Sequence, residues 1–456
     1  MGMRARRAVA RIPSRHQDRA RPFGVHSFSR RVSTTAIVVA MCGLADRLAG
    51  QMHSPDSMAA DTAARRIDLR AQAIALVTRI DPGPGNRSHT EGYVAQPLIM
   101  AHVRAFRGHV SGVLTLDLEG LTLDRGQLNP GAYGEGYVDR RHPHTYVHEA
   151  IASTSGALFG IGVSVSGGKG FVPFGTDDPM MRPFAAYPVN HHLAQILERY
   201  VAVAAVRRGP VTLEGALFNG DEPVSPGAPP DAGRFGDSWA TRATVVPVDV
   251  LEVEGSFASV ESPEIAAGGG RDQRKWSVGG RTDAKRGAFR GAFIEWARTD
   301  ELVGNVRVSR FSSVLGEATF GVGASSVSAR VENTTRPEDE RLSDPFRFSR
   351  TPTDLGIIGI TRWRIGTVAV SIPARVRRAT VAPFVEISYA SPREELTPSA
   401  FTPRDFYGAS EIWSASVGLR FGVGAMMHRM GRYGVALPNA PSMASMSDHM
   451  NLQHHH

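Results

Sequence analysis

Apolar and polar residues alternate one by one in many short stretches of the chain. Glu386 and Ser388 each stand between apolar neighbours, and the same alternation returns between residues 413 and 421. The apolar positions of these two stretches are Val381, Pro383, Val385, Ile387, Tyr389, Trp413, Ala415, Val417, Leu419 and Phe421. A repeat of two residues is that of a β-strand, whose successive side chains point to opposite faces. The pattern therefore predicts an all-β protein.

Charged residues occupy the polar phase in the middle of many predicted strands. These residues are Asp117, Glu119, Glu214, Glu252, Glu254, Glu317, Arg330, Glu332 and Arg420. Such charges are costly in a dry core, whereas the interior of a closed barrel supplies water and partners. We therefore predict a transmembrane antiparallel β-barrel of about 14 strands, within a range of about 12 to 16, in contact with outer-membrane lipid. A sheet with one solvated face would alternate in the same way, so a secreted, soluble, β-rich binding protein is the alternative.

The connections between predicted strands are of two lengths. Short ones, such as Arg207-Arg208-Gly209-Pro210, fit periplasmic turns. The long ones, which fit extracellular loops or a plug in the lumen, are residues 120–142, 169–191, 218–236, 334–352 and 392–407. Alternation of short and long connections is typical of outer-membrane barrels.

The two ends of the chain differ from its middle. An arginine-rich head and the apolar run of residues 34–45 predict a signal peptide over residues 1–50, because the run is too short to anchor a chain in a bilayer. Residues 51–92 are read as an N-terminal periplasmic extension, helical or irregular from 59 to 81. The barrel then covers residues 93–421, and residues 422–456 form a tail.

Composition and charge narrow the classes of function. The chain has a formal charge of +8 and a pI near 10.0, but nine arginines against one aspartate in residues 1–33 account for that excess. The remainder is close to neutral, so we predict no nucleic-acid partner. The one cysteine, Cys42, lies in the predicted leader, which excludes disulfides, a thiol nucleophile and cysteine-based zinc sites from the mature chain.

Four sequence islands carry a family resemblance. They are residues 139–144 (DRRHPH), Met181-Arg182-Pro183 with His191-His192, residues 218–223 (FNGDEP), and residues 262–264 (SPE). Over residues 90–335 the chain resembles a family of uncharacterised Gram-negative outer-membrane β-barrels with an Asp-Arg-x-His-Pro-His motif. It departs from the pattern of that family at Arg141 and Thr145. The resemblance implies a porin-like barrel in the outer membrane and does not imply a particular solute.

Histidines provide the first candidate metal site. His142, His144 and His148 fall within seven residues, and His191 and His192 belong to a later loop. Imidazoles at this density are able to hold Zn²⁺ or Cu²⁺ if the two regions meet. The alternative is a polar loop whose histidines are hydrogen-bonded to the barrel wall.

Methionines and histidines gather in the tail and provide the second candidate metal site. The residues proposed as ligands are Met426, Met427, His428, Met430, Met446, His449, Met450, His454, His455 and His456. Thioether and imidazole groups together suit copper, and the tail resembles Met/His-rich copper-resistance proteins of the outer membrane. The alternative is an extension without a metal role.

The sequence supports passage or binding of a small polar solute or metal cation, with copper as the candidate metal. Acidic residues outnumber basic ones in the predicted inward phase, which predicts cation preference if a pore is open. We find no phosphate-binding loop, no G-x-S-x-G elbow and no H-E-x-x-H helix, and expect no enzyme activity. A hydrolase site assembled from distant residues is the remaining alternative.

Overall fold

The computed structural model describes most of the chain between residues 66 and 437. The described ranges are 66–83, 85–122, 144–176, 178–189, 191–223, 225–284, 287–339, 357–395, 399–424 and 429–437.

The described residues form one antiparallel sheet that closes on itself. Its strands are β1 (Arg66–Gly83), β2 (Arg87–Ala105), β3 (Val110–Asp117), β4 (Val147–Leu158), β5 (Ile161–Gly170), β6 (Arg199–Arg208), β7 (Val211–Phe218), β8 (Ser238–Val248), β9 (Leu251–Val260), β10 (Asp272–Asp283), β11 (Phe289–Val303), β12 (Val306–Val322), β13 (Ser325–Asp339), β14 (Ile357–Ser371), β15 (Ala374–Val376), β16 (Ala379–Glu394) and β17 (Ile412–Val423). Each strand pairs with the next, and β1 closes the sheet by pairing with β17. The three-residue β15 pairs with β16 only, while β14 and β16 pair directly, so the wall is a barrel of 16 strands. The predicted fold and strand range are confirmed.

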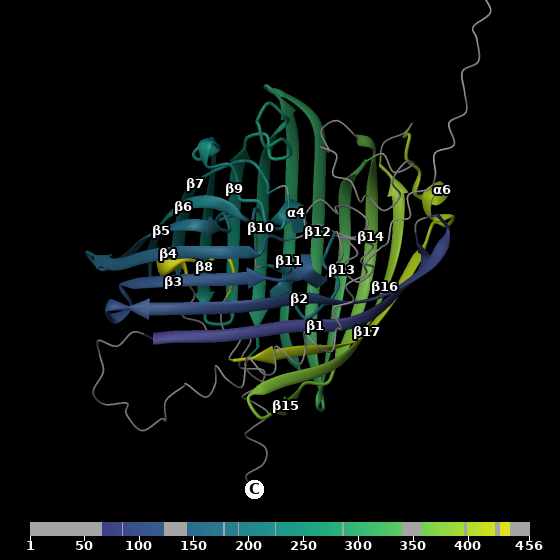
Figure 1. Cartoon of the computed structure of the whole chain (residues 1–456), viewed down its shortest axis with the longest axis horizontal. Coiled ribbons are helices and arrows are strands. Elements are labelled where there is room, and N and C mark those ends of the chain that lie inside the picture. The colour runs from purple at the N-terminus through teal and green to yellow at the C-terminus, as the bar shows by residue number, and fades with distance from the viewer. Residues whose placement is uncertain are drawn as a thin grey trace, which may run out of the picture.

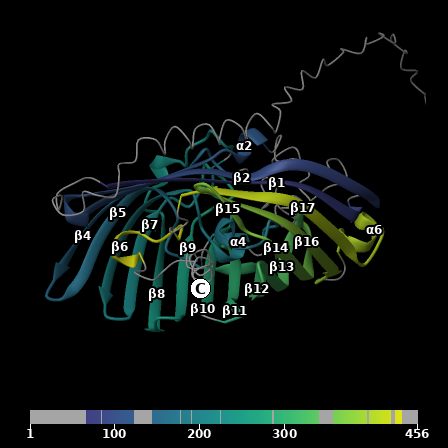
Figure 2. The ribbon, with the colours of Figure 1, turned by 90° about the horizontal axis from the view of Figure 1, so that it is seen from below.

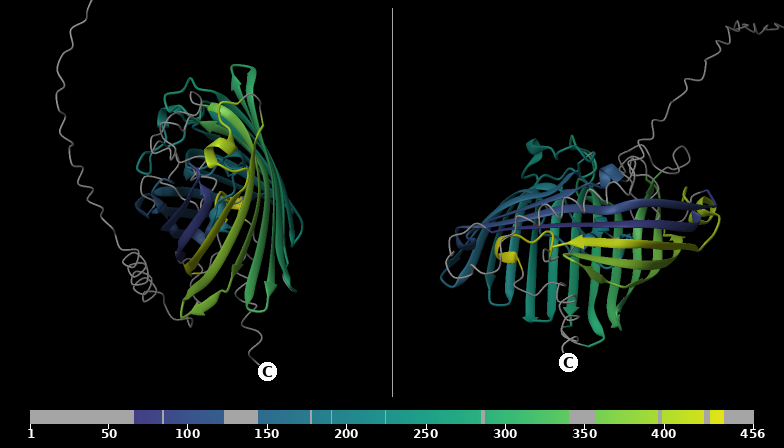
Figure 3. Two further views of the ribbon diagram at one scale, coloured as in Figure 1. Left: turned by 90° about the vertical axis from the view of Figure 1, so that its right-hand side faces the viewer. Right: turned by 60° about the horizontal axis from the view of Figure 1, so that its bottom comes forward.

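The strands are strongly tilted, as barrel closure requires. In Figure 1 the strands of the near wall, such as β1 to β3, cross those of the far wall, such as β10 to β13. Figure 2 shows the barrel from below, with the short helix α4 (His191–Ala194) in the space that the walls enclose, and Figure 3 shows two further sides. The other short helices are α2 (Glu119–Thr122) and α6 (Pro403–Tyr407). In the part of the chain that the structure describes, no helix is long and apolar enough to cross a membrane.

The apolar residues of the strands face outward and the polar residues face inward. In β7, Leu213 and Leu217 are 50% and 52% exposed, whereas Thr212 and Glu214 between them are buried. In β16, Val385 and Ile387 are exposed, and Glu386 is buried. This arrangement is the reverse of that in a water-soluble sheet, and it is the arrangement of a barrel that lies in lipid.

Some of the aromatic residues lie near the two rims of the barrel. Trp239, Phe257 and Trp276 form a ladder across β8, β9 and β10 at the long-loop rim, with ring centroids 5.2 and 5.4 Å apart. At the short-turn rim the rings of Phe289 and Phe320 lie 5.7 Å apart. Aromatic rings favour the boundary between lipid and water, so their positions delimit an apolar band.

The predicted N-terminal extension was wrong where it covers β1. This segment is a wall strand that pairs on one side with β17 and on the other with β2. Alanine is the best helix former, and Ala71, Ala73 and Ala75 gave the segment a helical appearance. Hydrogen bonds from two neighbouring strands override that preference, because closure of the barrel depends on β1.

Two further predictions need correction. Glu119 was placed on a strand, but β3 ends at Asp117 and Glu119 begins α2. The barrel was predicted to end at residue 421, whereas β17 continues to Val423, and residues 429–437 then lie inside the barrel. Both corrections concern positions where the alternating pattern stops, and where long-range contacts determine the local structure.

Cross-linking tests the closure of the barrel between β1 and β17. Val77 and Val417 are directly opposite each other in that pair, and both are exposed. Facing residues in antiparallel strands have Cα atoms about 4.5–5.5 Å apart, which suits a disulfide. We expect the V77C/V417C variant, made with Cys42→Ser, to form an intramolecular disulfide on mild oxidation, read as a mobility shift on a non-reducing gel.

The matched control is V77C/V331C, because Val331 is equally accessible but lies on β13, away from β1. Equal cross-linking of the two pairs would contradict the strand order.

Candidate functional site in the barrel lumen

A long connection between β5 and β6, residues 171–198, folds into the barrel and is named the lumen loop here. Wall carboxylates hold its backbone: Glu386 accepts hydrogen bonds from the amides of Ala185 and Ala186 at 2.8 and 3.0 Å. Glu332 accepts one from the amide of Val189 at 2.8 Å. Two of the acidic residues on the inner face therefore act as anchors for this loop.

Arginines also hold the lumen loop: one lies on the loop and two lie on the wall. Arg182, on the loop, lies 3.4 Å from a carboxylate oxygen of Glu317 and 3.8 Å from one of Glu295. In the opposite direction, Arg330 donates to the carbonyl of Ala186 at 2.9 Å, and Arg420 donates to the carbonyls of residues 182 and 183. The loop is thus held by charged groups of β11, β12, β13 and β17.

The loop turns sharply where glycine is required. Gly175 has φ +67°, and a Cβ at this position would lie 1.5 Å from the carbonyl oxygen of Ala194. Its amide donates to Ser256 at 2.8 Å. Only glycine fits this close approach of two parts of the loop.

A second inward segment follows the last strand; residues 429–437 are named the C-terminal segment here. Arg432 is buried and donates to Glu214 and Glu254, with Glu252 3.4 Å away. Arg429 also pairs with Glu252, at 2.7 Å. Glu214 is held in addition by Arg242 of β8 through two hydrogen bonds of 2.7 and 2.9 Å, so wall acids and arginines form one buried network.

Tyr433 connects the C-terminal segment with the lumen loop. Its hydroxyl donates to Glu149 at 2.8 Å and accepts from the amide of Phe171 at 2.9 Å. Burial, and then the negative charge of Glu149, raise the pKa of Tyr433 well above 10.0, so the hydroxyl keeps its proton. The two inward segments therefore share a hydrogen-bonded junction at the wall.

Apolar residues fill the lumen below the long loops. The cluster consists of Ile80, Val189, Trp363, Ile365, Ala390, Phe401, Tyr407 and Ile412, which come from four wall strands, the lumen loop and the segment around α6. Trp363 and Tyr407 are fully buried, with ring centroids 5.8 Å apart. Together with the two inward segments, this cluster occupies much of the interior among the described residues.

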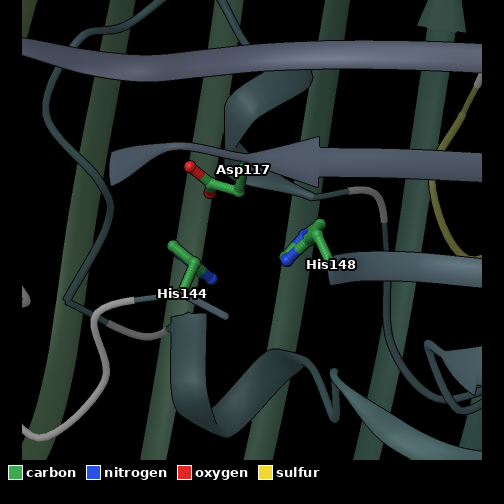
Figure 4. A group of neighbouring side chains, drawn as sticks. All are labelled: Asp117, His144 and His148. Carbon is green, nitrogen blue, oxygen red and sulfur yellow. The ribbon is translucent and has the colours of Figure 1, made fainter. Parts of the chain in front are cut away.

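Two histidines and three carboxylates meet beside β3 and β4, and form the histidine–carboxylate cluster: Asp117, His144, His148, Asp178 and Glu198. All five are at most 4% exposed. Donor atoms of Asp117, His144 and His148 lie within 4.8 Å of one another (Figure 4). The Nδ1 of His148 is 2.7 Å from a carboxylate oxygen of Glu198, and its Nε2 is 3.9 Å from Oδ2 of Asp178.

The loop carboxylates of this cluster are ionised. Burial alone would raise the pKa of Glu198, but hydrogen bonds from His144 and His148 outweigh it and hold the pKa well below its usual value. Asp178 behaves in the same way: burial opposes ionisation, and the hydrogen bond and charge of His148 lower its pKa. Negative charge is therefore concentrated around the two imidazoles.

The structure brings together only some of the predicted metal ligands. His144 and His148 meet, while His191 and His192 lie against each other with ring centroids 3.9 Å apart and are not in the group that converges on Asp117. Met430 is buried among apolar residues rather than placed with nitrogen ligands. Outside the described residues lie His142, Met426, Met427, His428, Met446, His449, Met450, His454, His455 and His456, so copper binding by the tail stays a prediction.

The predicted lumen charges lie on the inner face or beside it, and most contact the inward segments. Asp117 and Glu119 are hydrogen-bonded to each other: the backbone amide of Glu119 donates to the carboxylate of Asp117 at 2.8 Å. The arginine partners of other lumen acids, Arg182, Arg242 and Arg432, could not be recognised from the alternating pattern. Residues 429–433 (RMGRY) carried a signal, because two arginines and an aromatic residue stand in a tail otherwise rich in methionine.

No protein-family model matches the chain, and no curated protein matches it. Among solved structures, the chain is similar to an anion-selective porin from Comamonas acidovorans, with 10% identity, a TM-score of 0.48, and coverage of 79% of this chain and 100% of that chain. It is also similar to a loop-deletion mutant of OmpT, an outer membrane protein of Vibrio cholerae (10% identity, TM-score 0.45, coverage 79% and 99%). A third is the outer membrane channel DcaP of Acinetobacter baumannii (9% identity, TM-score 0.44, coverage 79% and 97%). Identities this low carry no information on what the chain binds.

Hydrogen exchange tests whether wall carboxylates hold the lumen loop. Replacing Glu386 with Ala leaves two buried amides without their acceptor, at a cost of about 1–3 kcal/mol each. We expect exchange at Ala185 and Ala186 to become roughly ten- to a hundred-fold faster. The control is Glu395→Ala, which removes a carboxylate paired with Arg362 outside the lumen; acceleration by both variants alike would contradict the anchoring role.

Proposed function

We propose that the protein is an outer-membrane β-barrel that passes or binds a small polar solute, in the manner of a porin. The observation that carries the proposal is the reversed alternation of the wall: exposed valines, leucines and isoleucines outside, and ionisable residues inside. A soluble binding protein would expose that apolar surface to water, which disfavours the soluble alternative.

Passage through this barrel depends on its inward segments. The lumen loop is joined to the wall at both of its ends, through β5 and β6. The C-terminal segment follows β17 and is held by ion pairs of Arg429 and Arg432 and by hydrogen bonds of Tyr433. We therefore assign it the role of a removable plug, and the lumen loop that of a fixed constriction.

The plug also affects the charge of the route. In its presence Glu214, Glu252 and Glu254 are neutralised by arginines. Withdrawal of the segment takes two of those arginines away and leaves an acidic wall. The opened channel would accordingly prefer cations, and the closed form would show little preference.

The proposed location of the protein in the outer membrane is tested by cell fractionation and a detergent gel. A closed barrel of paired strands resists unfolding in dodecyl sulfate until it is boiled, so we expect unheated protein to migrate faster than boiled protein and to fractionate with the outer membrane. Protein found in the soluble periplasmic fraction, with no heat-dependent shift, would exclude the proposed location and favour the soluble alternative.

Conductance in planar bilayers tests the plug. We expect the double variant R429A/R432A to show single-channel conductance at least about twofold above that of the unaltered chain, because Glu252 and Glu254 lose their arginine partners and the segment leaves the wall. The reversal potential in a salt gradient should shift toward cation selectivity.

The matched control is Arg310→Ala, since this arginine pairs with Asp300 at the outer part of the wall and does not contact the plug. Unchanged conductance and selectivity in the double variant would refute the role of the C-terminal segment. Hydrolysis of lipid or peptide substrates by the purified barrel would favour the hydrolase alternative instead.

A further inference from the structure

We infer that the histidine–carboxylate cluster is a binding site for one Zn²⁺ ion, which fastens the lumen loop to the barrel wall. The inference concerns a resident structural ion and does not depend on which solute passes through the barrel.

The donor atoms converge on a small closed space. Asp117 is fully buried, and its Oδ2 has no hydrogen-bond partner among the described residues. The Nε2 of His148, also fully buried, is paired with Oδ2 of Asp178 at the long distance of 3.9 Å. Buried polar atoms are normally hydrogen-bonded at about 2.7–3.2 Å, so an unpartnered carboxylate oxygen beside this long pair indicates a ligand.

The spacing of these groups suits a metal ion. Donor atoms within 4.8 Å of one another share a point about 2.8 Å or less from each of them. Zinc bonds to imidazole nitrogen and carboxylate oxygen measure about 2.0–2.2 Å, so Asp117, His144 and His148 would each move less than about 1 Å. Asp178, whose Oδ2 lies 3.9 Å from Nε2 of His148, stands next to these three ligands as the fourth.

Glu198 has the role of an orienting residue. A metal-bound histidine usually donates its second ring N–H to a carboxylate, which fixes the tautomer and directs the other nitrogen to the metal. The Nδ1 of His148 lies 2.7 Å from Glu198, so its Nε2 is the nitrogen left for the ion. The same carboxylate accepts the amide of Thr145 at 2.8 Å, which holds the backbone next to His144.

The charge of the cluster also favours a bound cation. Three buried carboxylates face two imidazoles in this cluster, and a divalent cation bound to them would offset most of the negative charge of the carboxylates. The donor set lacks thiolate and thioether groups, so it suits Zn²⁺ better than Cu(I). Divalent copper prefers similar ligands and generally binds more tightly, and zinc is therefore assayed with copper excluded.

The position of the site explains what the ion would do. Asp117 and His148 belong to wall strands, whereas Asp178 and Glu198 stand near the beginning and at the end of the lumen loop. An ion bound to both groups would connect the loop to the wall at this point. The wall acids Glu332 and Glu386 hold the middle of the loop, so the ion would add an attachment near both ends of the loop.

The experiment uses the full chain, folded in detergent without metal and titrated with Zn²⁺ against a competing chelator. We expect one Zn²⁺ per chain with a Kd below about 1 µM, and at least about tenfold weaker binding in Asp117→Asn and in His148→Gln. His109→Gln is the control, because this histidine is exposed on the turn before β3. Heat-dependent gel migration shows that each variant is folded.

A second measurement separates a fastening ion from one that is merely bound. Zinc should slow hydrogen exchange at the amides of Met180 and Thr145, which donate to Asp178 and Glu198, and should leave exchange in β12 unchanged. Equal zinc affinity in the cluster variants and the control, or no binding by the unaltered chain, would overturn the site. Binding without any change in exchange would overturn its fastening role.

Discussion

Charge placed inside the barrel is the constraint on which the rest of the structure depends. A wall that turns most of its apolar residues toward lipid places many ionisable residues in the interior, and buried charges are stable only with partners. Here the partners are supplied by the chain itself: backbone amides of the lumen loop bind Glu386 and Glu332, and arginines of the C-terminal segment bind Glu252 and Glu254. The filling of the lumen follows from the composition of its wall.

The barrel could be predicted from the sequence because its signal is local. Alternation in stretches such as residues 381–389 is visible without knowledge of any neighbour, and reversed polarity distinguishes a barrel in lipid from a soluble sheet. β1 could not be recognised in this way, because Ala71, Ala73 and Ala75 suit a helix as well as a strand. Its state is decided by β2 and β17, which lie on either side of it in space.

The candidate site was less predictable, for a related reason. The spacing of His144 and His148 marks them as neighbours, and the structure places them together. Their partners Asp178 and Glu198 come from a loop whose path is set by contacts such as that of Arg182 with Glu317, 135 residues away in the chain. No local pattern encodes such a contact, and single aspartates in loops are too common to single out.

The C-terminal segment has a consequence for any molecule that competes with it. It is a ligand covalently joined to its own receptor, since five residues separate the end of β17 at Val423 from Arg429. Tethers of this length give effective concentrations of about a millimolar or more. A free cationic peptide would need an intrinsic affinity for Glu214, Glu252 and Glu254 well beyond that of the segment itself. A molecule that binds and displaces the residues between Val423 and Arg429 would therefore open the barrel more readily than one that competes with the segment for these three glutamates.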